Sequence, residues 1–391
     1  MTAPTSAAGQ LLSPAVFGEN DRVMVTASRI SLARRRRGLT AAELARKVGV
    51  SAQSVSNYER DRQRPTVATV HGLADALGFP AEFFFRPEVA ELPGAAVSFR
   101  APSKLPGRLR GAALGAGQLA TEISGWLDIR FALPITGLPS LHRPDPETAA
   151  EMVRAEWGLG HAPAPNMVHL LESRGVRVFS VPGECAEVDA FSFWQGERPF
   201  VFLSTAKSPE RCRFDAAHEL GHLVLHAGAP ALDGPSAESE ANAFAAAFLL
   251  PRADVLARVS RGPLVDQVVE YRSRWRVSAL ALTYRLHDLE LLSDWQYRTV
   301  CGELSRRGFR RDEPGGVPRE GSQLLAKAFR ALREHGSGPQ EIAAALAIDM
   351  EELNSLVFGL VVTAVSTEGT SRMNGAAPDW HPGGTGLRLV P

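Results

Sequence analysis

The chain has 391 residues, 45% of them hydrophobic, which is enough apolar material for two or three folded domains. Its 43 basic and 43 acidic residues cancel, so any charged surface must arise from local asymmetry. Three widely separated cysteines argue against a disulfide framework and fit a reducing cytoplasm. Residues 1–20 lack the basic start and apolar core of a signal peptide, and the apolar run at 356–365 is too short to cross a bilayer. We therefore expect a soluble, cytoplasmic protein with no membrane partner.

Both ends of the chain have the composition of unfolded segments. Residues 1–20 are small and rich in Gly, Pro and Ser, and they predict a disordered leader. Residues 366–391 are rich in Gly and Pro and predict a disordered tail. Between them, changes in pattern divide the chain into four segments with different expected roles: 21–88, 89–145, 146–300 and 301–365.

The first of these segments, residues 21–88, has the pattern of a compact helical domain. Thr40-Ala-Ala-Glu43 is a capping box that starts a helix ending near Gly49, and Ser51 is the expected N-cap of the next helix. The small Gly49 permits the tight turn that a helix-turn-helix needs. With Arg64-Pro-Thr, these features resemble the XRE family of phage-repressor-like regulators over about 60 residues. The resemblance implies a five-helix domain that binds a double-stranded DNA operator.

Local charge also indicates a nucleic-acid partner. Residues 21–80 contain 11 basic and five acidic side chains, a net charge of +6 in a chain that is neutral overall. Such an excess is the electrostatic footprint of a phosphate-binding surface. Asn and Gln on a recognition helix can bond an adenine edge, whereas Arg at its borders is suited to phosphates. The expected contacts are Gln53, Ser54 and Asn57 for base edges, and Arg35 and Arg60 for phosphates.

The second segment, residues 89–145, is predicted to be a connector. Its stretch 99–106 has the pattern of a Pro-rich connector, and 109–131 has the pattern of a long helix that links the two functional parts. Further along, three apolar stretches predict a small sheet of about three strands: 176–180, 189–194 and 199–203.

The main chemical motif is His218-Glu-Leu-Gly-His222, in a stretch with helical spacing and no Pro. At 3.6 residues per turn, the two histidines lie one above the other and can reach one metal ion. Glu219 follows about 100° further round, near enough to deprotonate a metal-held water without becoming a ligand. His226 continues the same face but lies about 12 Å from His218, too far for the same metal.

A third protein ligand must therefore come from another element. Residues 238–251 predict a second helix that returns antiparallel to the first and can bring a carboxylate to the histidines. Glu238 and Glu240 are about 200° apart on this helix, so only one of them can face the metal. Glu238 is favoured over Glu240 because it shares its face with Asn242, which can orient the carboxylate. Two histidines and one glutamate, with water in the fourth position, form a catalytic zinc set.

Three runs resemble the ImmA/IrrE family of zinc metallopeptidases: Phe214-x-x-Ala-His-Glu-Leu-Gly-His222, Glu240-Ala-Asn-x-Phe-Ala245 and Leu249-Leu-Pro251. The resemblance covers roughly residues 150–290. It implies a Zn²⁺ ion held by His218, His222 and a glutamate from the second helix, with Glu219 as general base. It also implies a regulatory protein as the substrate. The chain departs from many gluzincins at Asn242, where they have Asp.

Residues 301–365 predict two or three further helices. Gly336–Leu346 resembles a weak second helix-turn-helix, but it has no strong basic excess, which favours packing or a homodimer contact over DNA binding. In total, the elements predict a mainly α protein with a small β-sheet, of the α+β class. An N-terminal helix-turn-helix domain is followed by a zincin-like metallopeptidase domain in residues 146–300.

These predictions combine into a DNA-binding transcriptional regulator with a zinc-dependent endopeptidase domain that cleaves a repressor or another regulatory protein. The alternative is a transcription factor whose peptidase-like domain is a non-catalytic sensor of a ligand or metal. The presence of Glu219 beside a complete ligand set favours catalysis, because a pure sensor would not need the base.

Overall fold

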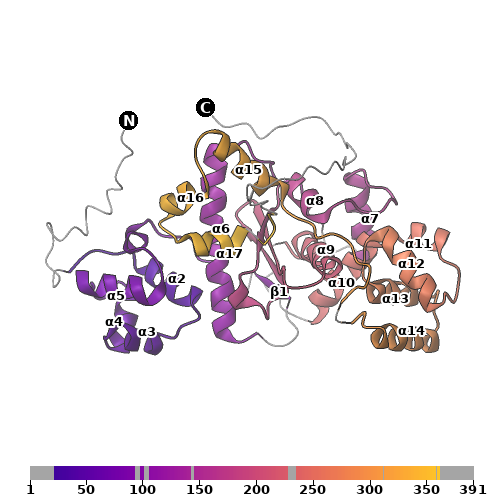
Figure 1. Ribbon diagram of the computed structural model, residues 1–391, viewed down its shortest axis with the longest axis horizontal. Coiled ribbons are helices and arrows are strands. Elements are labelled where there is room, and N and C mark those ends of the chain that lie inside the picture. Colours follow the sequence, from indigo (N-terminus) through magenta and orange to yellow (C-terminus); the bar gives the residue numbers. More distant parts are fainter. Residues whose placement is uncertain are drawn as a thin grey trace, which may run out of the picture.

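The computed structural model describes residues 22–92, 97–100, 105–141, 145–227, 235–310, 312–357 and 359–361. The predicted leader and tail lie outside these residues. A group of short helices occupies one end of the molecule, a small sheet and a long helix lie in the middle, and further helices form the other end (Figure 1). The protein is mainly α with a small β-sheet, as predicted. In the described part of the chain, no helix combines the length and apolar character needed to cross a membrane.

The N-terminal domain contains four α-helices and a short 3₁₀-helix: α2 (Ala27–Arg36), α3 (Ala41–Val48), α4 (Ala52–Glu59), α5 (Val67–Leu77) and η1 (Ala81–Phe85). The predicted capping box is present, because the Glu43 amide donates to Thr40 Oγ1 at 3.2 Å and the Thr40 amide donates to the Glu43 carboxylate. Gly49 ends α3 with a φ of 77°, a left-handed conformation that glycine adopts without strain. Ser51 caps α4 as expected.

The long helix α6 (Gly107–Arg130) joins this domain to the rest of the molecule. Its small residues allow very close packing, because a Cβ added to Gly115 would lie 3.1 Å from the Cα of Arg36 on α2. A Cβ added to Gly117 would lie 3.1 Å from the ring of Phe193 in the sheet. The predicted linking helix is therefore packed against both functional parts along its length.

The sheet has four strands in the order β1-β3-β4-β2: β1 (Ser98–Arg100), β2 (Arg177–Ser180), β3 (Ala190–Gln195) and β4 (Arg198–Leu203). Strands β2 and β4 are parallel, and the other neighbours are antiparallel. Strand β1, at the start of the predicted Pro-rich connector, was not predicted from the sequence: its Phe99 pairs with Phe191, and the two rings stack 5.3 Å apart. A strand of three residues is too short to show alternation, and its partner lies far away in sequence.

The sheet separates two apolar cores. On one face, phenylalanines such as Phe191 and Phe202 pack with α6, the N-terminal domain and three C-terminal helices. Those helices are α15 (Gln323–Glu334), α16 (Pro339–Leu346) and α17 (Met350–Val357). On the other face, Val201 and Leu203 pack with the helices of the second domain. These helices are α7 (Pro146–Glu156), α8 (Met167–Ser173), α9 (Pro209–Leu225), α10 (Pro235–Leu249), α11 (Arg252–Arg258), α12 (Val265–Trp275), α13 (Ala279–Asp288) and α14 (Asp294–Arg306). A short 3₁₀-helix, η3 (Gly183–Cys185), lies between β2 and β3, and its Cys185 belongs to the first core.

A buried ion-pair network fixes α17 to the N-terminal domain. Arg36 is 1% exposed, and its Nε donates to Glu352 Oε1 at 2.6 Å. The second oxygen of Glu352 accepts from Arg37, and Arg36 also lies 3.2 Å from Glu184. Two arginines of the basic run before Gly38 are therefore engaged by carboxylates inside the protein.

We predict that Glu352→Ala lowers the free energy of unfolding by about 3 kcal/mol, because it leaves the buried Arg36 charge with Glu184 alone. The neighbouring Glu351 is exposed, so Glu351→Ala should change stability by less than about 0.5 kcal/mol. Urea titration of both variants measures the difference. Equal unfolding midpoints would contradict a stabilising role for the network.

Candidate functional site

Helix α9 carries the histidine motif and is buried along most of its length. Gly221, between the two predicted ligands, lets α10 approach closely, because a Cβ at this position would lie 3.2 Å from the Cα of Ala241. A larger residue would push the helices apart. The close contact explains how side chains from the start of α10 reach the histidines of α9.

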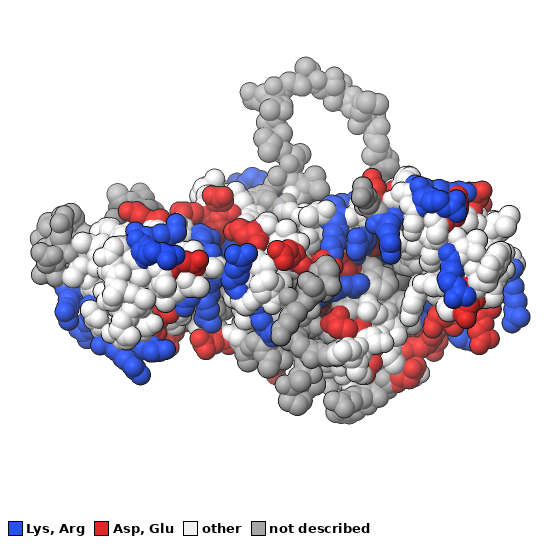
Figure 2. Space-filling model, turned by 90° about the horizontal axis from the view of Figure 1, so that it is seen from below, with Lys and Arg blue, Asp and Glu red and all other residues white. Residues whose placement is uncertain are grey.

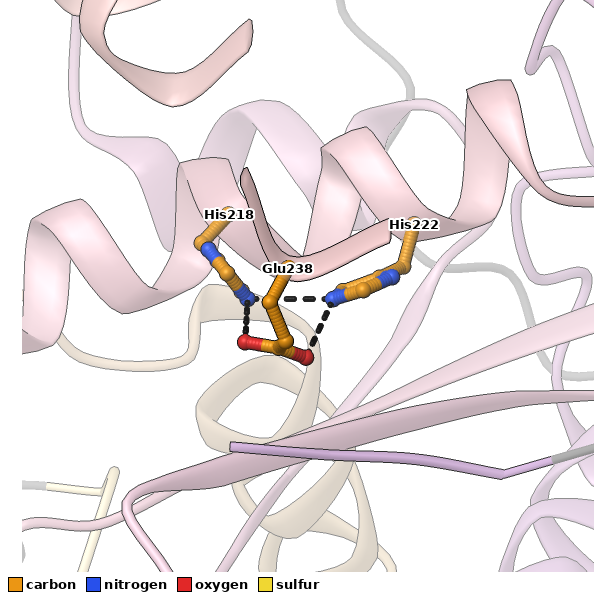
Figure 3. A group of neighbouring side chains, drawn as sticks. All are labelled: His218, His222 and Glu238. Carbon is orange, nitrogen blue, oxygen red and sulfur yellow. Dashed lines mark hydrogen bonds and ion pairs between the residues drawn. The ribbon is translucent and has the colours of Figure 1, made fainter. Parts of the chain in front are cut away.

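His218, His222 and Glu238 come together at one point, with one ligand atom from each lying within 4.8 Å of the others (Figure 3). The two Nε2 atoms are 3.0 Å apart, and the Glu238 oxygens lie 3.3 Å from His218 and 3.2 Å from His222. Zinc bonds of about 2.0–2.1 Å in tetrahedral geometry separate neighbouring ligand atoms by roughly 3.3 Å. The separations and the nitrogen and oxygen donors therefore fit a zinc ion.

The far side of each histidine ring is also bonded. His218 Nδ1 is 3.1 Å from the amide oxygen of Asn242, which can only accept, so this nitrogen donates. His222 Nδ1 is 3.0 Å from His226 Nδ1, and His226 Nε2 is 2.9 Å from Glu240 Oε2. With the Glu240 carboxylate accepting from His226, His226 accepts in turn from His222. Both predicted ligands thus present an unprotonated Nε2 toward Glu238.

The two glutamates on α10 have different partners. Glu238 lies against His218 and His222, whereas Glu240 lies against His226. The geometry favours Glu238 over Glu240 as the third ligand. Glu240 contacts His226, which in turn contacts the predicted ligand His222. From the sequence, His226 was predicted only to be too distant for the metal, and its contacts with His222 and Glu240 were not predicted.

Burial sets the protonation of the site. It lowers the pKa of His218 to about 4 and also lowers that of His222, which keeps both rings neutral and able to bind a metal at neutral pH. Burial raises the pKa of Glu219 well above its usual value, and a hydrogen bond from Ser192 opposes this rise. The Ser192 hydroxyl on β3 donates to Glu219 Oε2 at 2.6 Å. Sequence reasoning missed Ser192, because only the folded sheet brings β3 beside α9.

A cleft of about 510 Å³ opens beside these side chains. It is bounded by β1, α9, α10 and α13, and Glu238 and Asn242 form part of its wall. Tyr284 of α13 lies at its edge and is 56% exposed. The site therefore combines a metal-type ligand set, a buried carboxylate and an accessible cleft.

The predicted base-reading residues lie together on α4. Gln53 is exposed, Ser54 and Asn57 are partly exposed, and Gln53 Nε2 donates to Asn57 Oδ1 at 3.0 Å. Arg60 follows at the exposed end of the same helix. Basic side chains line the end of the molecule where α2 to α5 lie (Figure 2). The exposed basic residues of this domain are Arg22, Arg46, Lys47, Arg60, Arg62 and Arg64.

Arg35 does not join this group. Its aliphatic part lies against Gly111 of α6, and its guanidinium is 3.5 Å from Glu91. It faces the connector helix rather than the side of the domain that α4 presents. The sequence alone gave no sign of this, because the docking of α6 on α2 depends on contacts between distant segments.

Comparisons with known proteins agree with these two parts. A helix-turn-helix family model matches residues 30–84, and a model of the IrrE N-terminal-like domain matches residues 171–287. The chain is 41% identical over 58 residues to an uncharacterized HTH-type transcriptional regulator, y4dJ, of Sinorhizobium fredii. The matched stretch covers 75% of that protein and 15% of this chain. It is 43% identical over 42 residues to an "uncharacterized transcriptional regulator in ATPase CF(0) region" of Rhodospirillum rubrum. That matched stretch covers 39% of the relative and 11% of this chain.

The fold and these matches define a helix-turn-helix transcriptional regulator with a second, metallopeptidase-like domain. The chain belongs to the XRE-type helix-turn-helix family, and its second domain is of the IrrE/ImmA-like peptidase type.

We predict a graded loss of zinc affinity. Glu238→Ala removes a direct ligand and should abolish most binding, whereas His226→Ala and Glu240→Ala remove outer supports and should weaken it by about 10–100-fold or less. Competition with a chelating dye measures all three constants. Loss of binding in Glu240→Ala with full retention in Glu238→Ala would reverse the assignment.

Proposed function

We propose that the protein is a cytoplasmic, DNA-binding regulator whose second domain is a zinc endopeptidase that cleaves a repressor or another regulatory protein. The observation that carries the peptidase proposal is the position of Glu219. Its carboxyl is completely buried, is bonded by Ser192 at one oxygen, and follows His218 directly on the ligand helix. A site that only binds a ligand or metal has no need of such a group.

In the proposed reaction His218, His222 and Glu238 hold zinc, which when bound supplies Lewis-acid chemistry to the peptide carbonyl. Glu219 accepts the proton of the attacking water. Ser192 holds its Oε2, and Oε1 has no hydrogen-bond partner within the described residues, so that oxygen is available for the proton. Burial raises the pKa of Glu219, which makes its carboxylate a stronger proton acceptor than an exposed glutamate.

The N-terminal domain would bring this peptidase to an operator. Gln53, Ser54 and Asn57 would read bases in the major groove, and Arg60 with the exposed basic residues around it would bind phosphates. Because α6 packs against both parts, one molecule would hold DNA and substrate at the same time.

We predict that Glu219→Gln retains zinc and DNA affinity but slows peptide hydrolysis by about 10²–10⁴-fold, because an amide cannot accept the proton. His222→Ala serves as the control that loses the metal as well. Cleavage of the cellular partner and transcription from the regulated promoters are compared with the wild type. An unchanged transcriptional response in Glu219→Gln, with a lost response in His222→Ala, would exclude catalysis from the regulation.

For DNA, Asn57→Ala should reduce discrimination between sequences by about 1–3 kcal/mol. Arg60→Ala should weaken binding to all sequences and reduce the slope of log affinity against log salt by about 0.9. Titrations at several salt concentrations separate the two effects. An identical loss on operator and random duplexes for Asn57→Ala would rule out base reading by this residue.

A further inference from the structure

The first turn of α6 lies against the loop between α2 and α3, at a corner of the DNA-binding domain. A Cβ added to Gly38 in this loop would lie 3.8 Å from the backbone oxygen of Arg108 and 4.0 Å from its Cβ. One turn further along α6, Gly111 lies against Arg35. These contacts fix the position of Arg108 relative to the start of α3, although the two helices are well separated in the sequence.

Arg108 has an uncommitted charge at this corner. Its side chain is exposed, and it has no hydrogen bond or ion pair with any residue that the structure describes. The pKa of Glu43 is lowered first by its hydrogen bonds with Thr40 and, to a smaller extent, by the charges of Arg46 and Arg108. Arg108 therefore lies within electrostatic range of the first turn of α3. Glu43 is engaged in the capping box with Thr40, so it does not pair with Arg108.

The arginines that end α2 do not supply free charge here. Arg36 is buried against Glu352, and Arg37 donates to the second oxygen of the same carboxylate. Arg35 lies along α6, with its guanidinium near Glu91. The packing of α6 and α17 on α2 thus neutralises much of the basic run, and the exposed Arg108 places a positive charge at the same corner.

The corner is on the side of the domain that faces DNA. In a helix-turn-helix, the recognition helix enters the major groove while the helix before it crosses the sugar–phosphate backbone. Those helices are α4 and α3, and both lie along the lower edge of the molecule in Figure 1. The end of α6 that carries Arg108 lies at this edge too, because the opposite end reaches α16 at the upper edge, where Arg130 is 3.6 Å from Glu341. Figure 2 looks onto the lower edge and shows basic side chains over the helical end and further toward the middle of the molecule.

We propose that Arg108 binds a backbone phosphate of the operator beside those contacted by α3, so that α6 extends the DNA-binding surface beyond the helix-turn-helix. A guanidinium is suited to this partner, because its planar fork can donate to two phosphate oxygens at once. Such a contact positions the protein on DNA and carries no sequence information. Arg108 lies outside residues 30–84, the segment that the helix-turn-helix model matches. The inference rests on the proposed DNA binding by α4.

The test uses full-length variants and two fluorescently labelled DNA duplexes of different sequence, with dissociation constants measured by anisotropy at several salt concentrations. Arg108→Ala should reduce the slope of log affinity against log salt by about 0.9 and weaken binding to both duplexes about 5–10-fold at roughly 0.1 M salt. Arg108→Lys keeps a positive charge and should retain most of the slope. Arg108→Glu should bind more weakly than Arg108→Ala, because its carboxylate repels the phosphate.

Arg333→Ala is the matched control, because Arg333 is an exposed arginine in the last turn of α15, at the upper edge of the molecule. It removes the same charge more than a Debye length from α3, so its affinity should stay within about twofold of the wild type. Equal weakening by Arg333→Ala would show a general charge effect and overturn the contact.

Three other results would also overturn it: an unchanged slope in Arg108→Ala, a loss confined to one duplex, or a slope in Arg108→Lys as low as in Arg108→Ala. Arg60→Ala separates this inference from the function on which it rests. A reduced slope in Arg60→Ala with a normal slope in Arg108→Ala would remove only the contact from α6. A wild-type protein without salt-dependent DNA affinity would refute DNA binding itself.

Discussion

Polar groups that are taken out of water must be hydrogen-bonded, and this constraint determines the arrangement around α9. His218 and His222 are almost completely buried, yet each ring nitrogen that faces away from Glu238 has a partner. The partners come from the same helix and from α10, which can approach only because Gly221 has no side chain. The ligand geometry is thus a result of helix packing, and the supports behind the ligands are as much part of the site as the ligands themselves.

The parts of the site that follow from helical periodicity could be predicted from the sequence. The four-residue spacing puts His218 and His222 on one face, and the two-residue spacing separates Glu238 from Glu240. The capping box at Thr40 and the turn at Gly49 are equally local, and the structure contains both. In these cases the information lies within one or two turns of helix, so no knowledge of the tertiary structure is needed.

Contacts between distant segments could not be predicted in this way. Ser192 meets Glu219 only because β3 lies beneath α9, and the strand that ends at Arg100 becomes visible only when it pairs with β3. The burial of an arginine in the run before Gly38 could not be predicted either. The run contributes to the basic excess that predicted phosphate binding by residues 21–80, but Arg36 is buried against Glu352, more than 300 residues further along the chain. Charge composition identifies the domain that has a basic surface, but not which of its residues are on it.

The shared core on one face of the sheet has a thermodynamic consequence. The side chains of the DNA-binding domain, α6, one face of the sheet and the C-terminal helices belong to one continuous apolar cluster, so we expect these parts to unfold together. A ligand that binds only the folded chain then stabilises every part of that unit, wherever its own site lies. DNA binding should therefore also stabilise the sheet, including strand β3, which carries Ser192 beside Glu219. The sheet connects this unit to the metal-ligand helix, because its other face packs with α9 in the second apolar core.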